Sequence, residues 1–131
     1  SIDIPVVRKA SVTQKKNSQA LKIARLAAHF ASDKKAEDIV LLDMRKAANF
    51  CDYFLLCTGT SDRQMHAIAR GIEEGLEEKG IELRYRQGVK DARWVLLDLG
   101  PVVVHVFSRD ARQFYGLEYL WQEAKQVPCA L

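Results

Sequence analysis

Two apolar stretches joined by Gly100-Pro101 constrain the fold of this chain more than any other part of its sequence. Residues 93–98 and 102–107 are rich in valine and leucine, and a Gly-Pro step between two such stretches is typical of a tight turn. The pattern predicts a strand, a turn and a second strand. Residues 112–121 follow closely, and together with the two strands they hold both tryptophans. Because this region is rich in aromatic residues and poor in polar clusters, it favours docking of a partner over catalysis.

The remaining hydrophobic pattern predicts an α/β (α+β) domain. Predicted strands, each a short apolar or alternating run, cover residues 38–43, 53–58, 81–86, 93–98 and 102–107. Predicted helices, each with one apolar face, open at Ser18, at residues 59–64 and at Asp110. In the last of these helices we expect Phe114, Leu117 and Trp121 to share one side. This order of elements indicates a single mixed sheet of about five strands, with helices mainly on one side.

The distribution of charge separates a short arm from one domain over residues 18–131. Residues 1–17 lack a hydrophobic period and hold three more basic than acidic residues, which predicts a flexible basic arm. This excess equals the net charge of the whole chain, +3, so the domain is formally neutral. Domains that bind nucleic acid usually have a clear basic excess. We therefore expect RNA contact at most at the periphery, through the arm.

The cysteines and the absence of long apolar runs indicate in which cellular compartment we expect the protein. Cys51, Cys57 and Cys129 lack the spacing of metal ligands, which predicts reduced thiols in a cytosol-like compartment. No apolar run reaches the roughly 20 residues that span a bilayer, and the first residues lack the apolar segment of a signal peptide. We expect a cytoplasmic protein with no membrane association, no metal and no cofactor.

The segment Gly59-Thr60-Ser61 is the strongest candidate for a phosphate site, because a helix N-terminus presents unpaired N–H groups and a positive dipole end. Ser61 and Gln64 also have the spacing of a capping box, which explains the same residues without a ligand. A nucleotidyltransferase needs paired carboxylates for its metal ions, but Arg45 stands two residues after Asp43. A nucleotide-binding or nucleotidyltransferase-like enzyme using this helix N-terminus therefore remains the alternative function.

His105 and Asp98 lie on the two predicted strands that flank the Gly-Pro turn, so they are candidates for a general base and its orienting acid. No serine or cysteine nucleophile stands beside them in the sequence. A histidine within an apolar strand is more often a hydrogen-bonded structural residue, and this interpretation is the alternative.

The period of two in residues 93–98 places Trp94, Leu96 and Asp98 on one face of their strand. The opposite face is apolar enough to meet the helices. The face with Trp94 is mixed in character, as expected of an open or docking face. A core position for Trp94 remains the alternative.

Six motifs in this order and spacing closely resemble the Iojap (RsfS) family of ribosomal silencing factors, over about residues 18–125. They are Asp38-Ile39-Val40-Leu41-Leu42-Asp43, Asp52-Tyr53-Phe54, Thr58-Gly59-Thr60-Ser61 with Arg63-Gln64, Trp94-Val95-Leu96-Leu97-Asp98, Val103-Val104-His105-Val106, and Phe114-Tyr115 with Leu117-Glu118 and Leu120-Trp121. Each motif is weak alone, but the set is highly specific.

The resemblance implies a nucleotidyltransferase-like fold without catalytic carboxylates, and a protein that is not an enzyme. It implies binding to large-subunit ribosomal protein fourteen, so that the bound factor sterically blocks association of the ribosomal subunits and represses translation. It leaves a homodimer of the free protein open. The contact set that we predict supplies aromatic area and acidic groups for a basic partner. It consists of Trp94, Asp98, Tyr115, Leu117, Glu118 and Trp121.

Overall fold

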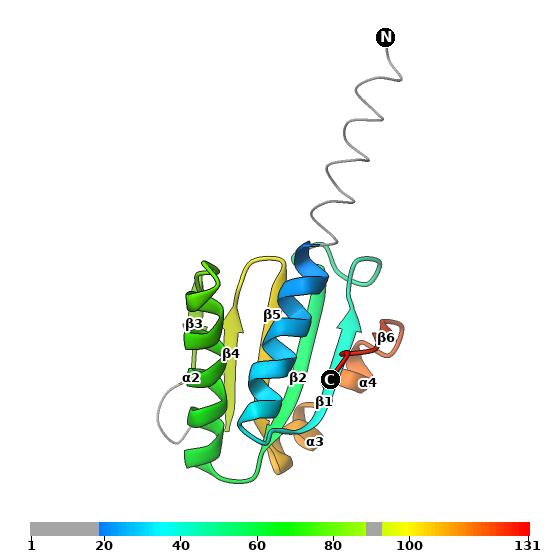
Figure 1. Ribbon diagram of the computed structural model, residues 1–131. Coiled ribbons are helices and arrows are strands. Elements are labelled where there is room, and N and C mark those ends of the chain that lie inside the picture. Colours follow the sequence, from blue (N-terminus) through cyan, green and yellow to red (C-terminus); the bar gives the residue numbers. More distant parts are fainter. Residues whose placement is uncertain (1–18, 89–92) are drawn as a thin grey trace.

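The computed structural model describes residues 19–88 and 93–131 (Figure 1). The predicted basic arm over residues 1–17 and the predicted helix cap Ser18 lie outside the described residues. A helix over residues 19–33 comes first, as the sequence predicts. The elements that follow are β1 (Glu37–Asp43), β2 (Tyr53–Gly59), α2 (Asp62–Glu78), β3 (Tyr85–Gln87), β4 (Trp94–Asp98), β5 (Val102–Ser108), α3 (Arg109–Tyr115), α4 (Leu117–Leu120) and β6 (Lys125–Val127). No helix in the two described ranges is long and apolar enough to cross a membrane.

The strands form one six-stranded sheet in the order β3-β4-β5-β2-β1-β6. β2 and β5 pair in parallel, and every other neighbouring pair is antiparallel. The prediction of a single mixed sheet is therefore confirmed. β2 and β5 are the central strands and are buried on both faces, which explains why their sequences are almost continuously apolar.

Two strands differ from the prediction. The strand expected over residues 81–86 is shorter, because the backbone N–H of Ile81 donates to the oxygen of Leu76 and closes the end of α2. β3 therefore covers only Tyr85–Gln87. The sequence pattern does not predict β6, because its three residues show no apolar alternation and its position depends on pairing with β1.

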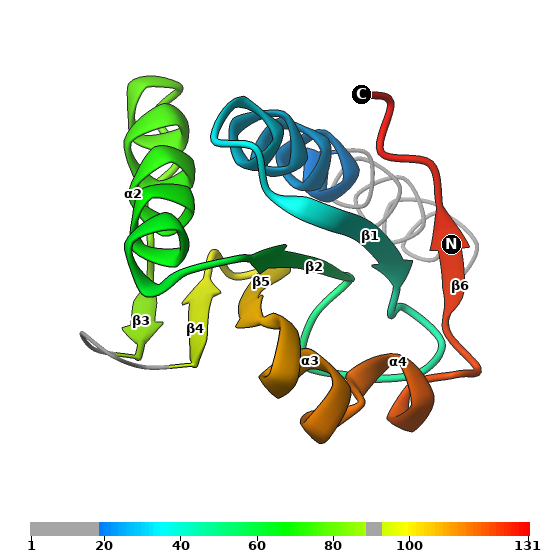
Figure 2. The same ribbon diagram turned by 90° about the horizontal axis from the view of Figure 1, so that it is seen from below.

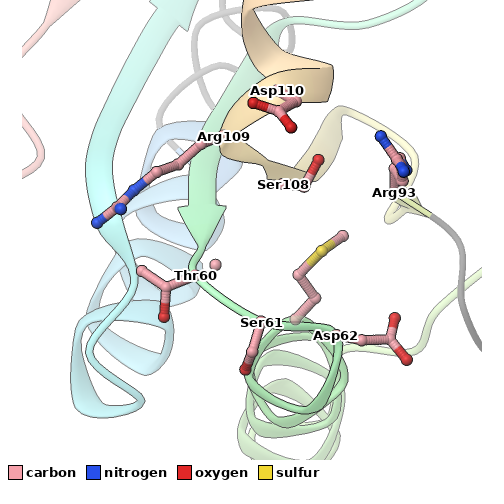
Figure 3. Close-up of a pocket in the computed structure, with 9 residues that line it drawn as sticks. Thr60, Ser61, Asp62, Arg93, Ser108, Arg109 and Asp110 are labelled. Carbon is pink, nitrogen blue, oxygen red and sulfur yellow. The ribbon is translucent and has the colours of Figure 1, made fainter.

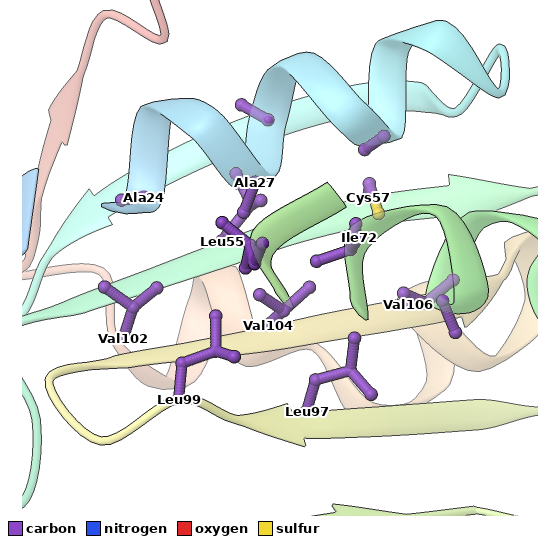
Figure 4. Close-up of a cluster of buried hydrophobic side chains, with 14 of the residues drawn as sticks. Ala24, Ala27, Leu55, Cys57, Ile72, Leu97, Leu99, Val102, Val104 and Val106 are labelled. Atoms are coloured by element: carbon purple, nitrogen blue, oxygen red, sulfur yellow. The ribbon is translucent and has the colours of Figure 1, made fainter. Parts of the chain in front are cut away.

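The two faces of the sheet carry different layers (Figure 2). The helix over residues 19–33 and α2 cover one face, whereas the short helices α3 and α4 lie against the other. The main core lies under the two long helices, where side chains of β2, β4, β5 and α2 meet (Figure 4). The predicted alternation in β4 is confirmed, since Val95 and Leu97 are buried in this core while Trp94 and Leu96 lie on the other side.

The single helix predicted from Asp110 is two short helices in the structure. Gly116 separates α3 from α4 with a φ of 56°, a left-handed conformation that favours glycine. Ser108 and not Asp110 caps α3, because its hydroxyl accepts a backbone N–H of the first turn at 3.1 Å. The break leaves Leu117 buried and Phe114 81% exposed, so the prediction that they share one side is wrong.

Phe30 packs against Gly75 where the helix over residues 19–33 approaches α2. A Cβ atom at position 75 would lie 2.7 Å from atoms of the Phe30 ring. Gly75→Ala should therefore lower the free energy of unfolding by about 1 kcal/mol, because the cost of overpacking exceeds the gain in helix propensity. Urea denaturation measures this change.

Gly71→Ala is the matched control, one turn earlier in α2. There the atoms nearest to an added Cβ belong to the flexible side chain of Lys34, at 3.0 Å. This variant should raise the free energy of unfolding by about 0.5 kcal/mol, because alanine favours the helix over glycine. A rise in stability for both variants would contradict the close packing of Phe30 on Gly75.

Candidate docking surface

A continuous group of aromatic rings crosses the sheet face that carries α3 and α4. We call this group the aromatic face; it consists of Phe50, Phe54, Trp94, His105, Phe107, Phe114, Tyr115 and Trp121. Neighbouring ring centroids lie between 4.5 Å, for Phe54 and His105, and 6.3 Å, for Phe50 and Trp121. These are the separations at which aromatic pairs stabilise one another beyond simple burial.

The outer part of this face is open to solvent. Large apolar side chains are strongly exposed on both short helices, with Phe114 81%, Tyr119 77% and Leu120 65% exposed. Phe50 and Tyr115 are exposed beside them. Monomeric proteins seldom leave large apolar side chains together on one surface unless that surface binds a partner. The arrangement is therefore typical of a docking surface.

Trp94 is held from behind by His105 and Phe107. Its indole Nε1–H donates to His105 Nδ1 at 3.1 Å, and its ring centroid lies 5.0 Å from that of Phe107. His105 is only 3% exposed, and this burial lowers the pKa of its imidazole to about 4. The ring is therefore neutral at pH 7, and Nδ1 has the lone pair that accepts the hydrogen bond.

Asp98 does not contact His105. Its carboxylate accepts the Gly100 N–H at 2.8 Å and fixes the turn before β5. Of the two ring nitrogens of His105, Nδ1 accepts from Trp94 and Nε2 has no hydrogen-bond partner among the described residues, so neither is bonded to Asp98. The prediction that His105 and Asp98 form a general base and its orienting acid is wrong. The interpretation of His105 as a hydrogen-bonded structural residue is confirmed.

Arg112 of α3 connects the sheet to both short helices. Its guanidinium donates to Thr58 Oγ1 at 2.9 Å and to the backbone oxygen of Asp38. Its Nε donates to Glu118 Oε1 at 2.9 Å, which attaches α4. The Glu118 side chain is 47% exposed, but Arg112 is only 12% exposed and Thr58 is buried, so the charge-assisted bond to Thr58 is sheltered from water. The three bonds act together. They fix the exposed aromatic side chains of the two helices relative to the sheet.

The structure brings three of the predicted contact residues, Trp94, Tyr115 and Trp121, into the aromatic face. Trp94 and Tyr115 lie 4.7 Å apart between ring centroids. Trp121 lies beside Phe54, at 6.1 Å. Glu118 is exposed on α4 and accepts a hydrogen bond from Arg112.

The other two predicted contact residues are placed differently. Leu117 is 8% exposed, so its side chain belongs to the core beneath the aromatic face. Asp98 lies at the opposite end of β4 from Trp94, about 13 Å along the strand. The predicted contact set does not include the most exposed apolar residues on and beside this surface, because a pattern of apolar residues does not distinguish exposed from buried positions. They are Phe50, Phe114, Tyr119 and Leu120.

A pocket lies where α2 and α3 begin, at the carboxyl ends of β2 and β5 (Figure 3). The Ser61 hydroxyl accepts the Gln64 N–H at 3.0 Å, and Gln64 Oε1 accepts the Thr60 N–H at 2.6 Å. The capping interpretation of these residues is therefore confirmed. Arg109 at this pocket is paired with Glu37 at 2.7 Å, and two aspartates add negative charge to the lining. Ser61, Gln64 and Arg109 thus each have a partner within the protein.

Ser61→Ala should lower the free energy of unfolding by about 1 kcal/mol, because it removes the acceptor for an N–H group of the first turn of α2. Thermal or urea unfolding measures the loss. Ser32→Ala is the control, since Ser32 is an exposed serine within the helix over residues 19–33. Equal stability of both variants would show that the cap contributes nothing.

Arg45 is bonded to the carboxylate of Asp43, the group that a nucleotidyltransferase would use as a metal ligand. Its guanidinium donates to both oxygens of Asp43, at 2.9 Å and 2.6 Å, and this hydrogen bonding holds the pKa of the Asp43 carboxyl below its usual value. Within residues 19–88 and 93–131, no group of three or more His, Cys, Asp or Glu is arranged to hold a metal ion.

Burial raises the pKa of the Cys51 and Cys57 thiols to about 12, so neither is a thiolate at pH 7.

Comparison with known proteins gives consistent matches over most of the chain. Residues 16–130 match the family described as RsfS, ribosomal silencing factor during starvation. The ribosomal silencing factor RsfS of Bacillus subtilis is 51% identical over 102 residues, which are 78% of this chain and 86% of that protein. The chloroplastic Iojap protein of Arabidopsis thaliana is 34% identical over 111 residues, covering 85% of this chain and 46% of that protein. A crystal structure from Bacillus halodurans is 44% identical and superimposes with a TM-score of 0.73, covering 82% of this chain and 97% of that one.

Proposed function

Because the chain belongs to the RsfS family of ribosomal silencing factors, we propose that it represses translation by binding the large ribosomal subunit. Its partner there is ribosomal protein fourteen, and the bound factor sterically blocks association with the small subunit. It acts by occupying a surface and carries out no catalytic step.

The aromatic face is the observation that supports this proposal. Its half-buried rings, such as Trp94, are fixed by the sheet, and the short helices beside them add exposed apolar side chains, such as Phe114 and Tyr119. Interfaces are enriched in tryptophan, tyrosine and phenylalanine, and large anchored aromatic side chains often supply most of the binding energy. A rigid aromatic surface of this kind suits a preformed partner on the ribosome.

The contacts that we propose follow from the placement of each residue. Trp94, Tyr115 and Trp121 supply buried area, and Glu118 meets basic groups of a protein that itself lies on RNA. Leu117 supports these contacts from the core, and Asp98 supports them by fixing the turn between β4 and β5.

Sedimentation of purified Bacillus subtilis ribosomal subunits tests the proposal, with the full chain added under conditions in which the subunits join. We expect the amount of joined ribosomes to fall and the protein to travel with the large subunit. Unchanged joining, with the protein at the top of the gradient, would contradict the proposal. Sedimentation equilibrium shows separately whether the free protein forms a dimer.

Leu120→Ala and Leu131→Ala form a matched pair for this assay. The two leucines are similarly exposed, at 65% and 62%, so neither variant should change stability appreciably. Leu120→Ala should weaken binding to the large subunit about fivefold, equivalent to about 1 kcal/mol, whereas Leu131→Ala should not change it. The same affinity for both variants would remove α4 from the contact surface.

A further inference from the structure

We infer that His105 is a positioning residue for the docking surface, with its Nδ1 fixing the orientation in which Trp94 presents its indole to the ribosomal partner. The inference deepens the proposed function and rests on it. It concerns a buried residue that makes no contact with a partner itself.

The sheet register brings the two side chains together. Trp94 is directly opposite Phe107 across β4 and β5, and His105 is the diagonal neighbour on the same face. The indole Nε1–H reaches His105 Nδ1 at 3.1 Å, within normal hydrogen-bond range. Tyr115 lies beside the same indole, at 4.7 Å between centroids, so the indole is held by a packing contact and by a directional one.

His105 itself is held rigidly, which makes it suitable as a fixed acceptor. The Phe54 ring lies 4.5 Å from it at an interplanar angle of 70°, and the Phe107 ring is nearly parallel to it at 6.0 Å. Packing on both sides fixes the imidazole plane and therefore the direction of the Nδ1 lone pair. A tryptophan N–H bonded to this lone pair has little freedom to rotate.

The hydrogen bonding of the imidazole indicates that this acceptor is the reason for a histidine at position 105. Indole N–H is only a donor, so Nδ1 must be unprotonated and the imidazole proton resides on Nε2. Nε2 is buried and has no hydrogen-bond partner among the residues that the structure describes. An unpaired buried donor is unfavourable, and a phenylalanine would fill the same apolar site without it. The polar contact that His105 does make is the one with Trp94.

Two substitutions separate the acceptor from the packing. His105→Phe keeps an aromatic ring in the core and removes the acceptor, whereas His105→Asn loses the ring and retains an amide oxygen near the position of Nδ1. The readouts are the indole N–H resonance of Trp94 in a ¹H–¹⁵N spectrum, its exchange rate with solvent, and the affinity for the purified large subunit. Trp121→Phe assigns the two tryptophan resonances.

We expect His105→Phe to stay folded, with unchanged or higher thermal stability, while the indole proton of Trp94 exchanges at least tenfold faster and subunit affinity falls about tenfold. His105→Asn should be less stable and yet recover part of the indole protection and of the affinity. Wild-type affinity in His105→Phe, or no recovery in His105→Asn, would overturn the positioning role. If the wild-type chain itself does not bind the subunit, the proposed function fails, while the exchange rates still report whether His105 holds Trp94.

Discussion

Replacing Trp94 with alanine is expected to weaken binding to the large ribosomal subunit about 30-fold, equivalent to about 2 kcal/mol. The indole is half-buried, with the Phe107 ring behind it and the Tyr115 ring beside it, so it is a large side chain already fixed before binding. Its loss removes contact area and also releases Tyr115. Co-sedimentation at a series of protein concentrations gives the affinity.

Ile72→Val is the control for a general loss of stability. Ile72 lies in the core under the long helices, on the opposite side of the sheet from Trp94. This variant should cost about 1 kcal/mol of folding stability and leave subunit binding unchanged. If Trp94→Ala remains folded and binds like the wild type, Trp94 is not an anchor of the interface.

Acid should destabilise the folded protein through His105, by up to about 3 kcal/mol between pH 6.5 and pH 4. Burial lowers the pKa of His105 to about 4, while the unfolded chain has the ordinary value near 6.5. Between these values the unfolded state binds the extra proton, so the free energy of unfolding falls as the pH falls. Urea denaturation at closely spaced pH values measures the slope.

His105→Phe should flatten this part of the pH profile. The Asp43 carboxyl, whose pKa is held low by Arg45, contributes its own loss of stability only at lower pH, because its unfolded value is near 3.8. The losses of stability due to His105 and to Asp43 therefore occur in different pH ranges. A wild-type profile that is flat from pH 6.5 to pH 4 would show that the imidazole is not buried as the neutral form.

The parts of the fold that the sequence predicts well are those in which a local pattern is sufficient. β2 and β5 are apolar throughout because both faces are covered, and β4 alternates because its two faces meet different layers. The capping box of α2 is confirmed for the same reason, since Ser61 and Gln64 interact over a single turn.

The parts that the sequence does not predict depend on distant contacts or on one backbone angle. β6 is ordered by pairing with β1, far away in the sequence, and its own residues show no strand pattern. The division of the last helix depends on the left-handed conformation of Gly116. Arg112 reaches Thr58 and Asp38, which are 54 and 74 residues away, so its role in holding α3 is invisible to local analysis.

The exposed side chains of the candidate surface also depend on distant contacts and are not predicted from a local pattern. The tryptophan and tyrosine motifs identify the region, but exposure decides which side chains are available, and exposure is a property of the assembled sheet. Leu117 and Leu120 have the same side chain three residues apart, yet Leu117 is in the core and Leu120 is exposed. Only the orientation of α4 on the sheet distinguishes them.

The two hydrophobic clusters lie on opposite faces of one sheet and share only its backbone. The side chains of the aromatic face therefore do not take part in the packing under the long helices. Substitutions in the core under the long helices can therefore change the stability of the fold and leave the aromatic side chains on the other face unchanged. Under the proposed function, a change in the partner can be matched by substitutions on α3, α4 and one face of β4 alone, with that core left intact.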